Sequence, residues 1–154
     1  MTNKRPVLVA GTIGYDPHNI GIKILQLALE QAGFEIANLG IYNSQEDFIK
    51  ASIETGAVGI LVGSYYGHGE FDCRGFKEKC KEAGLGNVLL YIGGYLSVGK
   101  PQWKDVEAKF KSLGFDRVYP QKTLPQQVIN DLRLDLTSRG VKIPKLDEVT
   151  PSES

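Results

Sequence analysis

The chain has 154 residues, and its 18 lysine and arginine residues balance its 18 aspartate and glutamate residues. This length suits one domain that buries about two-thirds of its unfolded surface. The balanced charge does not favour nucleic acid or an anionic membrane, and no apolar stretch approaches the ~20 residues that cross a bilayer. We therefore expect a globular domain with no nucleic-acid or membrane partner. The lack of a signal-peptide-like apolar segment near residue 1 favours the cytoplasm.

The chain alternates short apolar runs with amphipathic segments. Residues 6–14 form an apolar run closed by glycine, which is typical of a buried parallel strand. Apolar residues from Ile20 to Ala32 then recur near the helical period of 3.6, and Gly33 supplies the stop signal. The further strands are expected at 34–39, 58–62, 88–92 and 117–119, and the further helices at 45–54, 70–83, 103–113 and 125–136.

This alternation of strands and helices indicates an α/β fold with a doubly wound, five-stranded parallel sheet. We favour the flavodoxin-like (Rossmann-like) order 2-1-3-4-5, in which a crevice opens between the carboxyl ends of the first and third strands. Residues 1–136 are expected to form the domain. Residues 137–154 contain prolines and a serine-rich end, so we expect a flexible extension there.

Two groups of residues resemble metal or redox sites but are not expected to be such sites. Cys73 and Cys80 lie seven positions apart in an expected helix, which separates them by roughly 10 Å along its axis, too far for a disulfide. His68, Glu70 and Asp72 are poorly spaced for one tetrahedral metal, and the two acids suit a helix N-terminus. We expect free cysteines and helix capping.

Residues 16–21 read Asp-Pro-His-Asn-Ile-Gly, between the first expected strand and the first expected helix. Open α/β sheets bind ligands at this edge. A neutral imidazole at His18 is a good metal ligand, and Asp16 is placed to hold its other ring nitrogen. Pro17 restricts the backbone and stiffens the segment. The same six residues also suit an ordinary turn in which Asp16 caps the helix.

The spacing of Asp16, His18 and Gly21 resembles the Asp-x-His-x-x-Gly motif that supplies the lower cobalt ligand in cobalamin-dependent mutases and methyltransferases. Further blocks at 66–75, 90–94, 98–100 and 114–119 follow in the same order. Together they resemble the small subunit of glutamate mutase (methylaspartate mutase), from the first strand to Leu136. The resemblance implies that His18 binds the cobalt of adenosylcobalamin in place of the cofactor's own dimethylbenzimidazole.

The resemblance also implies a set of cofactor-binding residues at three strand ends. They are Tyr15, Asp16, Pro17, His18, Asn19 and Gly21 after the first strand, Gly63, Ser64 and Tyr65 after the third, and Gly93, Gly94, Tyr95, Leu96, Ser97, Val98 and Gly99 after the fourth. His18 is the expected metal ligand, and no catalytic residue is expected in this chain beyond it. The glycine pair after the fourth strand also suits a plain turn.

The chain departs from the family pattern at one place. The relatives carry Ser-x-Leu where this chain has Gly63 and Tyr65, and their serine hydroxyl meets the base nitrogen of the nucleotide tail. Gly63 has no hydroxyl, so Ser64 or a tyrosine hydroxyl is the candidate replacement. Tyr65 and Tyr66 also suit aromatic side chains that cover the core at a strand end.

By resemblance, the chain is the cobalamin-binding subunit of an adenosylcobalamin-dependent carbon-skeleton mutase that interconverts L-glutamate and threo-3-methylaspartate. A mutase needs a closed chamber for its substrate. We find no arginine cluster or second domain that would build one, so a large TIM-barrel subunit is the expected partner. The expected complex has two small and two large chains, and the small chain is expected to be inactive alone.

Two other functions fit part of the pattern. The first is a stand-alone cobalamin carrier or sensor that serves a methyltransferase or a regulator. The second is a flavodoxin-like nucleotide binder, which fits the fold but leaves the spacing of Asp16, His18 and Gly21 unexplained.

Overall fold

A five-stranded parallel sheet forms the centre of the computed structural model, which describes residues 5–14, 20–99 and 101–144. The strands are β1 (Val7–Thr12), β2 (Glu35–Asn38), β3 (Gly59–Gly63), β4 (Leu89–Gly93) and β5 (Arg117–Tyr119). Their order is β2-β1-β3-β4-β5, with every neighbouring pair parallel. The expected α/β, doubly wound, flavodoxin-like fold is confirmed.

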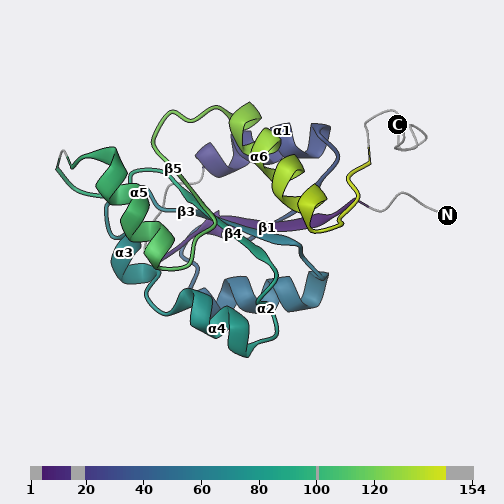
Figure 1. The fold of residues 1–154 in the computed structure, drawn as a ribbon, viewed down its shortest axis with the longest axis horizontal. Helices are drawn as coiled ribbons and strands as arrows, with labels where there is room; N and C mark the ends of the chain where they lie inside the picture. The colour runs from purple at the N-terminus through teal and green to yellow at the C-terminus, as the bar shows by residue number, and fades with distance from the viewer. Residues whose placement is uncertain (1–4, 15–19, 100, 145–154) are drawn as a thin grey trace.

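Helices cover both faces of the sheet (Figure 1). One face carries α1 (Ile20–Gln31) and α6 (Pro125–Ser138). The other carries α2 (Gln45–Thr55), α3 (Gly69–Asp72), α4 (Phe76–Glu82) and α5 (Trp103–Ser112). None of the helices in the described part of the chain is long and apolar enough to span a membrane.

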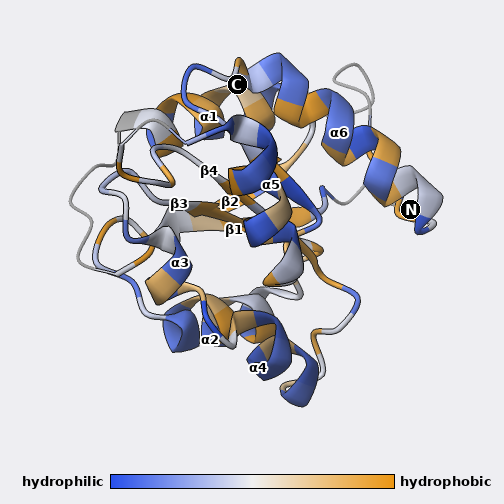
Figure 2. Ribbon diagram, turned by 60° about the vertical axis from the view of Figure 1, so that its left-hand side comes forward, coloured by the Kyte–Doolittle hydropathy of each residue, from blue (hydrophilic) through white to orange (hydrophobic). Residues whose placement is uncertain are grey.

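Each face of the sheet has its own hydrophobic core. Under α1 and α6 the core includes Leu29, Phe34 and Leu132, and under α2, α4 and α5 it includes Phe48 and Phe110, all fully buried. All five residues of β3 are buried because helices lie on both of its faces. Hydrophobic residues accordingly concentrate on the strands and the inner sides of the helices (Figure 2).

The register of the strands brings three strand ends to one level. Thr12 pairs with Gly63, and Gly63 pairs with Gly93. Beyond the strands, the Ile13 N–H donates to the Gly63 carbonyl at 3.1 Å, and the Ser64 N–H donates to the Gly93 carbonyl at 3.0 Å. The carboxyl ends of β1, β3 and β4 therefore form one continuous edge.

The single helix expected over 70–83 is wrong, because the chain forms two short helices there. Gly75 separates them with a left-handed backbone angle, φ 75°, which breaks the helical path. Cys73 follows α3 and Cys80 lies in α4, and both are buried and free as expected. Burial raises the pKa of both thiols, most strongly that of Cys73, so they pack as neutral side chains.

The last helix continues past its expected end at Leu136 to Ser138. Beyond it, Val141 and Ile143 pack against the core under α1 and α6, and Pro144 is buried. The boundary expected at residue 136 therefore lies inside α6, and Val141, Ile143 and Pro144 of the expected extension pack on the domain. Residues 145–154 lie outside the described residues.

Candidate functional site

The chain leaves β1 and β3 toward opposite faces of the sheet. It runs from β1 to α1 on one face, and from β3 to α3 and α4 on the other (Figure 1). Ligands of open α/β sheets bind at such a switch point. Five expected site residues lie outside the described residues: Tyr15, Asp16, Pro17, His18 and Asn19. The last described residue before them, Gly14, is held at this edge by a 2.7 Å hydrogen bond to the Asn43 carbonyl.

A cavity of about 410 Å³ opens beside this switch point, between α1, α6 and the carboxyl ends of β3, β4 and β5. Its lining includes Gly21 and Leu25 of α1, Gly94 after β4, and Val128 of α6. Most of the lining is apolar or aromatic, and the volume lies within the range of small-molecule pockets. Lys122 is the one charged side chain among the described residues that line it.

Tyr65 projects into this cavity between three of the expected site glycines. A Cβ atom added at Gly21 would lie 2.8 Å from the Tyr65 hydroxyl oxygen. A Cβ at Gly63 would lie 2.9 Å from Cε2 of the ring, and one at Gly94 would lie 2.8 Å from Cδ1. The ring thus fills space that these three glycines leave open. Gly63 and Tyr65 are coupled, because a side chain at position 63 would displace the ring.

Ser64 faces the other side of the sheet. It is fully buried, and its Oγ lies 3.0 Å from where a Cβ at Gly69 would be, close to the Phe110 ring. Within the described residues, this Oγ has no hydrogen-bond partner. Because neighbouring side chains on a strand alternate between faces, Tyr65 rather than Ser64 carries a hydroxyl to the cavity.

The loop after β4 contributes less to the cavity than the sequence suggests. Gly93 and Gly94 line it, whereas Leu96 is buried in the opposite core, under α2, α4 and α5. The remaining expected loop residues are not among the described residues that line the cavity: Tyr95, Ser97, Val98 and Gly99. The Tyr95 carbonyl instead accepts a 3.1 Å hydrogen bond from the Gly67 N–H, which joins this loop to the one after β3.

Two tyrosines that line the cavity were not expected from the sequence, Tyr91 of β4 and Tyr119 of β5. Burial raises the pKa of the Tyr91 hydroxyl, and its hydrogen bond to Asp135 raises it further. Burial likewise raises the pKa of Tyr119, together with its hydrogen bond to Asp131. Both hydroxyls therefore stay protonated at neutral pH. Strand alternation was the available signal, because Tyr91 lies two residues before Gly93 and shares its face.

The side chains of His68, Glu70 and Asp72 each contact neighbouring residues, and His68 makes no side-chain capping hydrogen bond at the start of α3. Among the described residues, no cluster of three histidine, cysteine or acidic side chains is arranged to hold a metal. Asp72 accepts a 2.5 Å hydrogen bond from the Tyr66 hydroxyl, and the His68 ring lies 4.8 Å from the Tyr66 ring, centroid to centroid. Glu70 pairs with Lys109 at 3.2 Å.

A model of one protein family matches most of this chain. The model described as the B12 binding domain matches residues 6–116, which run from β1 through α5. This span includes the strand ends at Gly63 and Gly93 and the segment 15–19.

Curated relatives narrow the class further. A glutamate mutase sigma subunit from Carboxydothermus hydrogenoformans is 58% identical over 129 residues, covering 84% of this chain and 94% of the relative. The sigma subunit from Clostridium cochlearium is 51% identical over 133 residues (86% and 97%), and that from Escherichia coli O157:H7 is 46% identical over 136 residues (88% and 91%). The chain belongs to the glutamate mutase sigma subunit family, as its sequence motifs predicted.

Solved structures support the fold. A cobalamin-binding protein from Desulfitobacterium hafniense superposes with a TM-score of 0.70 at 22% identity, covering 86% of this chain and 60% of that one. A receiver domain of the response regulator NarL from Mycobacterium tuberculosis superposes with a TM-score of 0.60 at 11% identity, covering 88% of this chain and 98% of that one. These likenesses concern the fold alone, since unrelated functions share it.

Proposed function

We propose that the chain is the cobalamin-binding subunit of an adenosylcobalamin-dependent mutase that interconverts L-glutamate and threo-3-methylaspartate. The observation that carries this proposal is the cavity beside the β1 and β3 switch point, in a chain that is 58% identical to a glutamate mutase sigma subunit. We further propose that the chain acts in the cytoplasm with a large TIM-barrel subunit, two small chains to two large ones, and is inactive without it. The folded domain would reach Pro144.

The described residues fit the nucleotide tail of cobalamin. Its heterocyclic base is flat and aromatic, and the cavity offers the rings of Tyr65, Tyr91 and Tyr119 together with apolar side chains of α1 and α6. Gly21 and Gly94 line the cavity, and because neither has a Cβ the Tyr65 ring can lie against both. When bound, adenosylcobalamin supplies a cobalt–carbon bond whose homolysis begins a radical rearrangement.

We assign the metal ligand to residues 15–19, which lie outside the described residues. His18 in its neutral form would donate a ring nitrogen lone pair to cobalt, and Asp16 would accept a hydrogen bond from the other ring nitrogen. Pro17 would restrict the backbone between them. We assign the substrate to the large subunit, because a dicarboxylate needs several cations and the cavity has one, Lys122, among its described lining residues.

Reconstitution tests the proposed function. The chain is mixed with the large subunit of a glutamate mutase, adenosylcobalamin and L-glutamate, and 3-methylaspartate is measured. We expect product from the complete mixture and none when either subunit is omitted. Tight cobalamin binding without product would favour a stand-alone carrier or sensor, and a chain that does not bind cobalamin would contradict both functions.

Replacing Asp16 by asparagine should weaken catalysis more than folding. A carboxylate that accepts from the imidazole raises its basicity, and loss of such a partner typically costs ~10 to 100-fold in affinity or activity. We expect a loss in this range in the reconstituted complex, with an unchanged thermal unfolding midpoint. Full activity of the Asp16→Asn complex would rule out this role for Asp16.

Restoring the family's Ser-x-Leu pattern should strengthen tail binding only when both positions change. In Gly63→Ser alone, the new Cβ would lie 2.9 Å from Cε2 of Tyr65, so the ring must move before the hydroxyl helps. Tyr65→Leu removes that obstacle. One neutral hydrogen bond is worth about 0.5 to 1.5 kcal/mol, so the double variant should bind cobalamin up to roughly tenfold more tightly.

Calorimetric titration of cobalamin into the wild type, both single variants and the double variant, with the large subunit present, measures this coupling. We expect the gain of the double variant to exceed the sum of the single effects. Equal affinities, or a tighter wild type, would show that the Tyr65 hydroxyl already serves the tail or that the tail does not enter here.

A further inference from the structure

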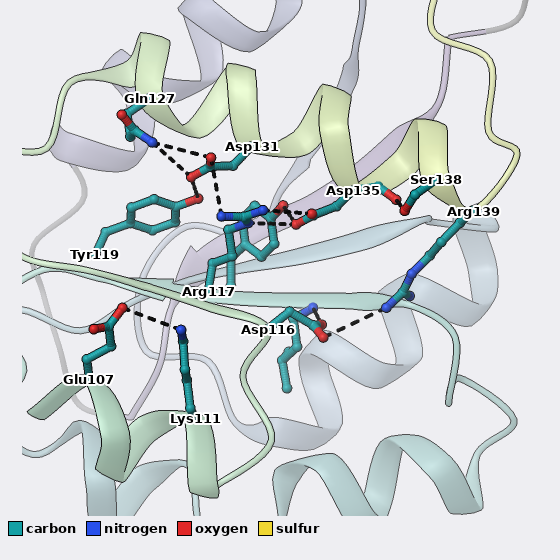
Figure 3. Close-up of polar contacts among 12 residues, drawn as sticks. Glu107, Lys111, Asp116, Arg117, Tyr119, Gln127, Asp131, Asp135, Ser138 and Arg139 are labelled. Atoms are coloured by element: carbon teal, nitrogen blue, oxygen red, sulfur yellow. Dashed lines mark hydrogen bonds and ion pairs between the residues drawn. The ribbon is translucent and has the colours of Figure 1, made fainter. Parts of the chain in front are cut away.

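A partly buried polar network joins α6 to the strands beside the cavity (Figure 3). Arg117 of β5 makes two hydrogen bonds of 2.8 Å to Asp135, one from Nε and one from Nη2. Its Nη1 also lies 3.4 Å from Oδ1 of Asp131. The carboxylates are four residues apart on α6, so both face the sheet. Arg117 lowers the pKa of Asp135, which keeps this carboxylate ionised.

The same two carboxylates hold two rings of the cavity wall. The Tyr119 hydroxyl donates to Oδ2 of Asp131 at 2.7 Å, and the Tyr91 hydroxyl donates to Oδ2 of Asp135. The two rings meet edge to face with centroids 5.8 Å apart. Because both rings line the cavity, the network outside it fixes the position of its wall.

Charge and burial explain why Tyr91 and Tyr119 donate hydrogen bonds to these carboxylates. Two carboxylates share one guanidinium, so acceptor oxygens remain after Arg117 has made its bonds. Asp131 is only 8% exposed and Tyr91 only 1%, so few water molecules can hydrogen-bond to either side chain. Leaving a buried polar group unpaired costs free energy. Each tyrosine hydroxyl therefore keeps its hydrogen bond to a carboxylate, and this bond fixes the position of its ring.

We infer that Asp131, Asp135 and Arg117 are positioning residues for the cofactor's nucleotide tail, acting through the rings of Tyr119 and Tyr91. This inference rests on the proposed function, since it concerns the cavity assigned to that tail. The three residues link α6 to β5 and keep both rings in place at the cavity wall before any ligand enters. Such preorganisation lowers the cost of ordering the site on binding.

The test compares two corrinoids, cobalamin and cobinamide, which lacks the nucleotide tail. We expect Asp131→Ala and Tyr119→Phe each to weaken cobalamin binding by about threefold to tenfold, the worth of one hydrogen bond, and to leave cobinamide binding unchanged. In Asp131→Ala, Arg117 keeps both hydrogen bonds to Asp135, so α6 stays linked to β5. Tyr119→Phe retains the ring and provides a second test if the alanine variant is unstable.

Two further variants separate positioning from a general loss of stability. Asp131→Asn keeps an oxygen that accepts from Tyr119, so it should restore most of the cobalamin affinity. Asp131→Ala also removes the 3.4 Å ion pair with Arg117 and the 3.3 Å hydrogen bonds from Gln127. The double variant of Asp131→Ala and Tyr119→Phe should therefore lose no more than Asp131→Ala alone, because the bond from Tyr119 is already absent in that variant. Glu107→Gln is the matched control, since Glu107 lines a cleft together with Tyr119 and Asp131 but pairs only with Lys111 in the described part of the chain.

The outcomes are distinct. A selective loss of cobalamin affinity with rescue by asparagine supports the inference. Unchanged cobalamin affinity in both single variants, or an equal loss for cobalamin and cobinamide, overturns it. A wild-type chain that binds cobalamin no better than cobinamide would instead contradict the proposed function, and the inference with it.

Discussion

Replacing His18 by alanine should lower the activity of the reconstituted complex by at least about 100-fold. Loss of a residue that only supports a metal ligand costs up to about 100-fold, so loss of the ligand itself should cost no less. The chain has two histidines, and His68 provides the matched control. His68 is exposed at the start of α3, where its side chain makes no capping hydrogen bond.

We expect His68→Ala to stay within about twofold of the wild type, as exposed substitutions usually do. Activity is measured as methylaspartate formation with saturating large subunit, and cobalamin affinity by calorimetry. Equal losses in the two variants would show that the histidines matter for stability rather than for ligation. Full activity in His18→Ala would remove the proposed ligand.

Replacing Gly94 by alanine should have the largest effect among the residues of the cavity wall. Gly94 has φ 120°, a conformation that residues with a side chain rarely adopt. The added Cβ would lie 2.8 Å from Cδ1 of Tyr65 and would also overlap the Ser64 carbonyl oxygen. Backbone strain and overpacking each cost about 1 to 3 kcal/mol, so we expect the free energy of unfolding to fall by about 3 kcal/mol.

Gly84→Ala isolates the contribution of backbone strain. Gly84 also has a positive φ, 82°, but among the described residues no atom lies within 4 Å of an added Cβ. We expect this control to lose only about 1 kcal/mol and to keep its cobalamin affinity. Denaturant titration measures both variants. Similar losses of stability in Gly94→Ala and Gly84→Ala would mean that the Tyr65 ring moves aside and that the cavity wall is not rigid.

Most elements of the fold were predictable because apolar periodicity is a local signal. The runs around β3 and β4 are short and continuous, as buried parallel strands require, and the helices repeat near 3.6 residues. The break between α3 and α4 was missed because the apolar positions Cys73, Phe76 and Cys80 keep a helical spacing across it. Only the left-handed conformation of Gly75 reveals it.

The candidate site was partly predictable. Gly21 and Gly94 follow from the family motifs, whereas Gly63 departs from them. The opposite orientations of Ser64 and Tyr65 depend on strand alternation, which the motif does not state. In the sequence, the positions of Tyr91 and Tyr119 are equally typical of core residues and of cavity-lining residues. Their partners Asp131 and Asp135 lie on α6, and sequence spacing does not define how α6 sits over β5.

The most direct test of the central claim is electron paramagnetic resonance of the Co(II) form of cobalamin bound to the chain, grown with nitrogen-15 histidine. The label enters at His18 and His68 alone. If His18 is the lower cobalt ligand, the spectrum will show nitrogen-15 coupling in the wild type and in His68→Ala, and none in His18→Ala. Absence of the coupling in the wild type, or its persistence in His18→Ala, would contradict the claim.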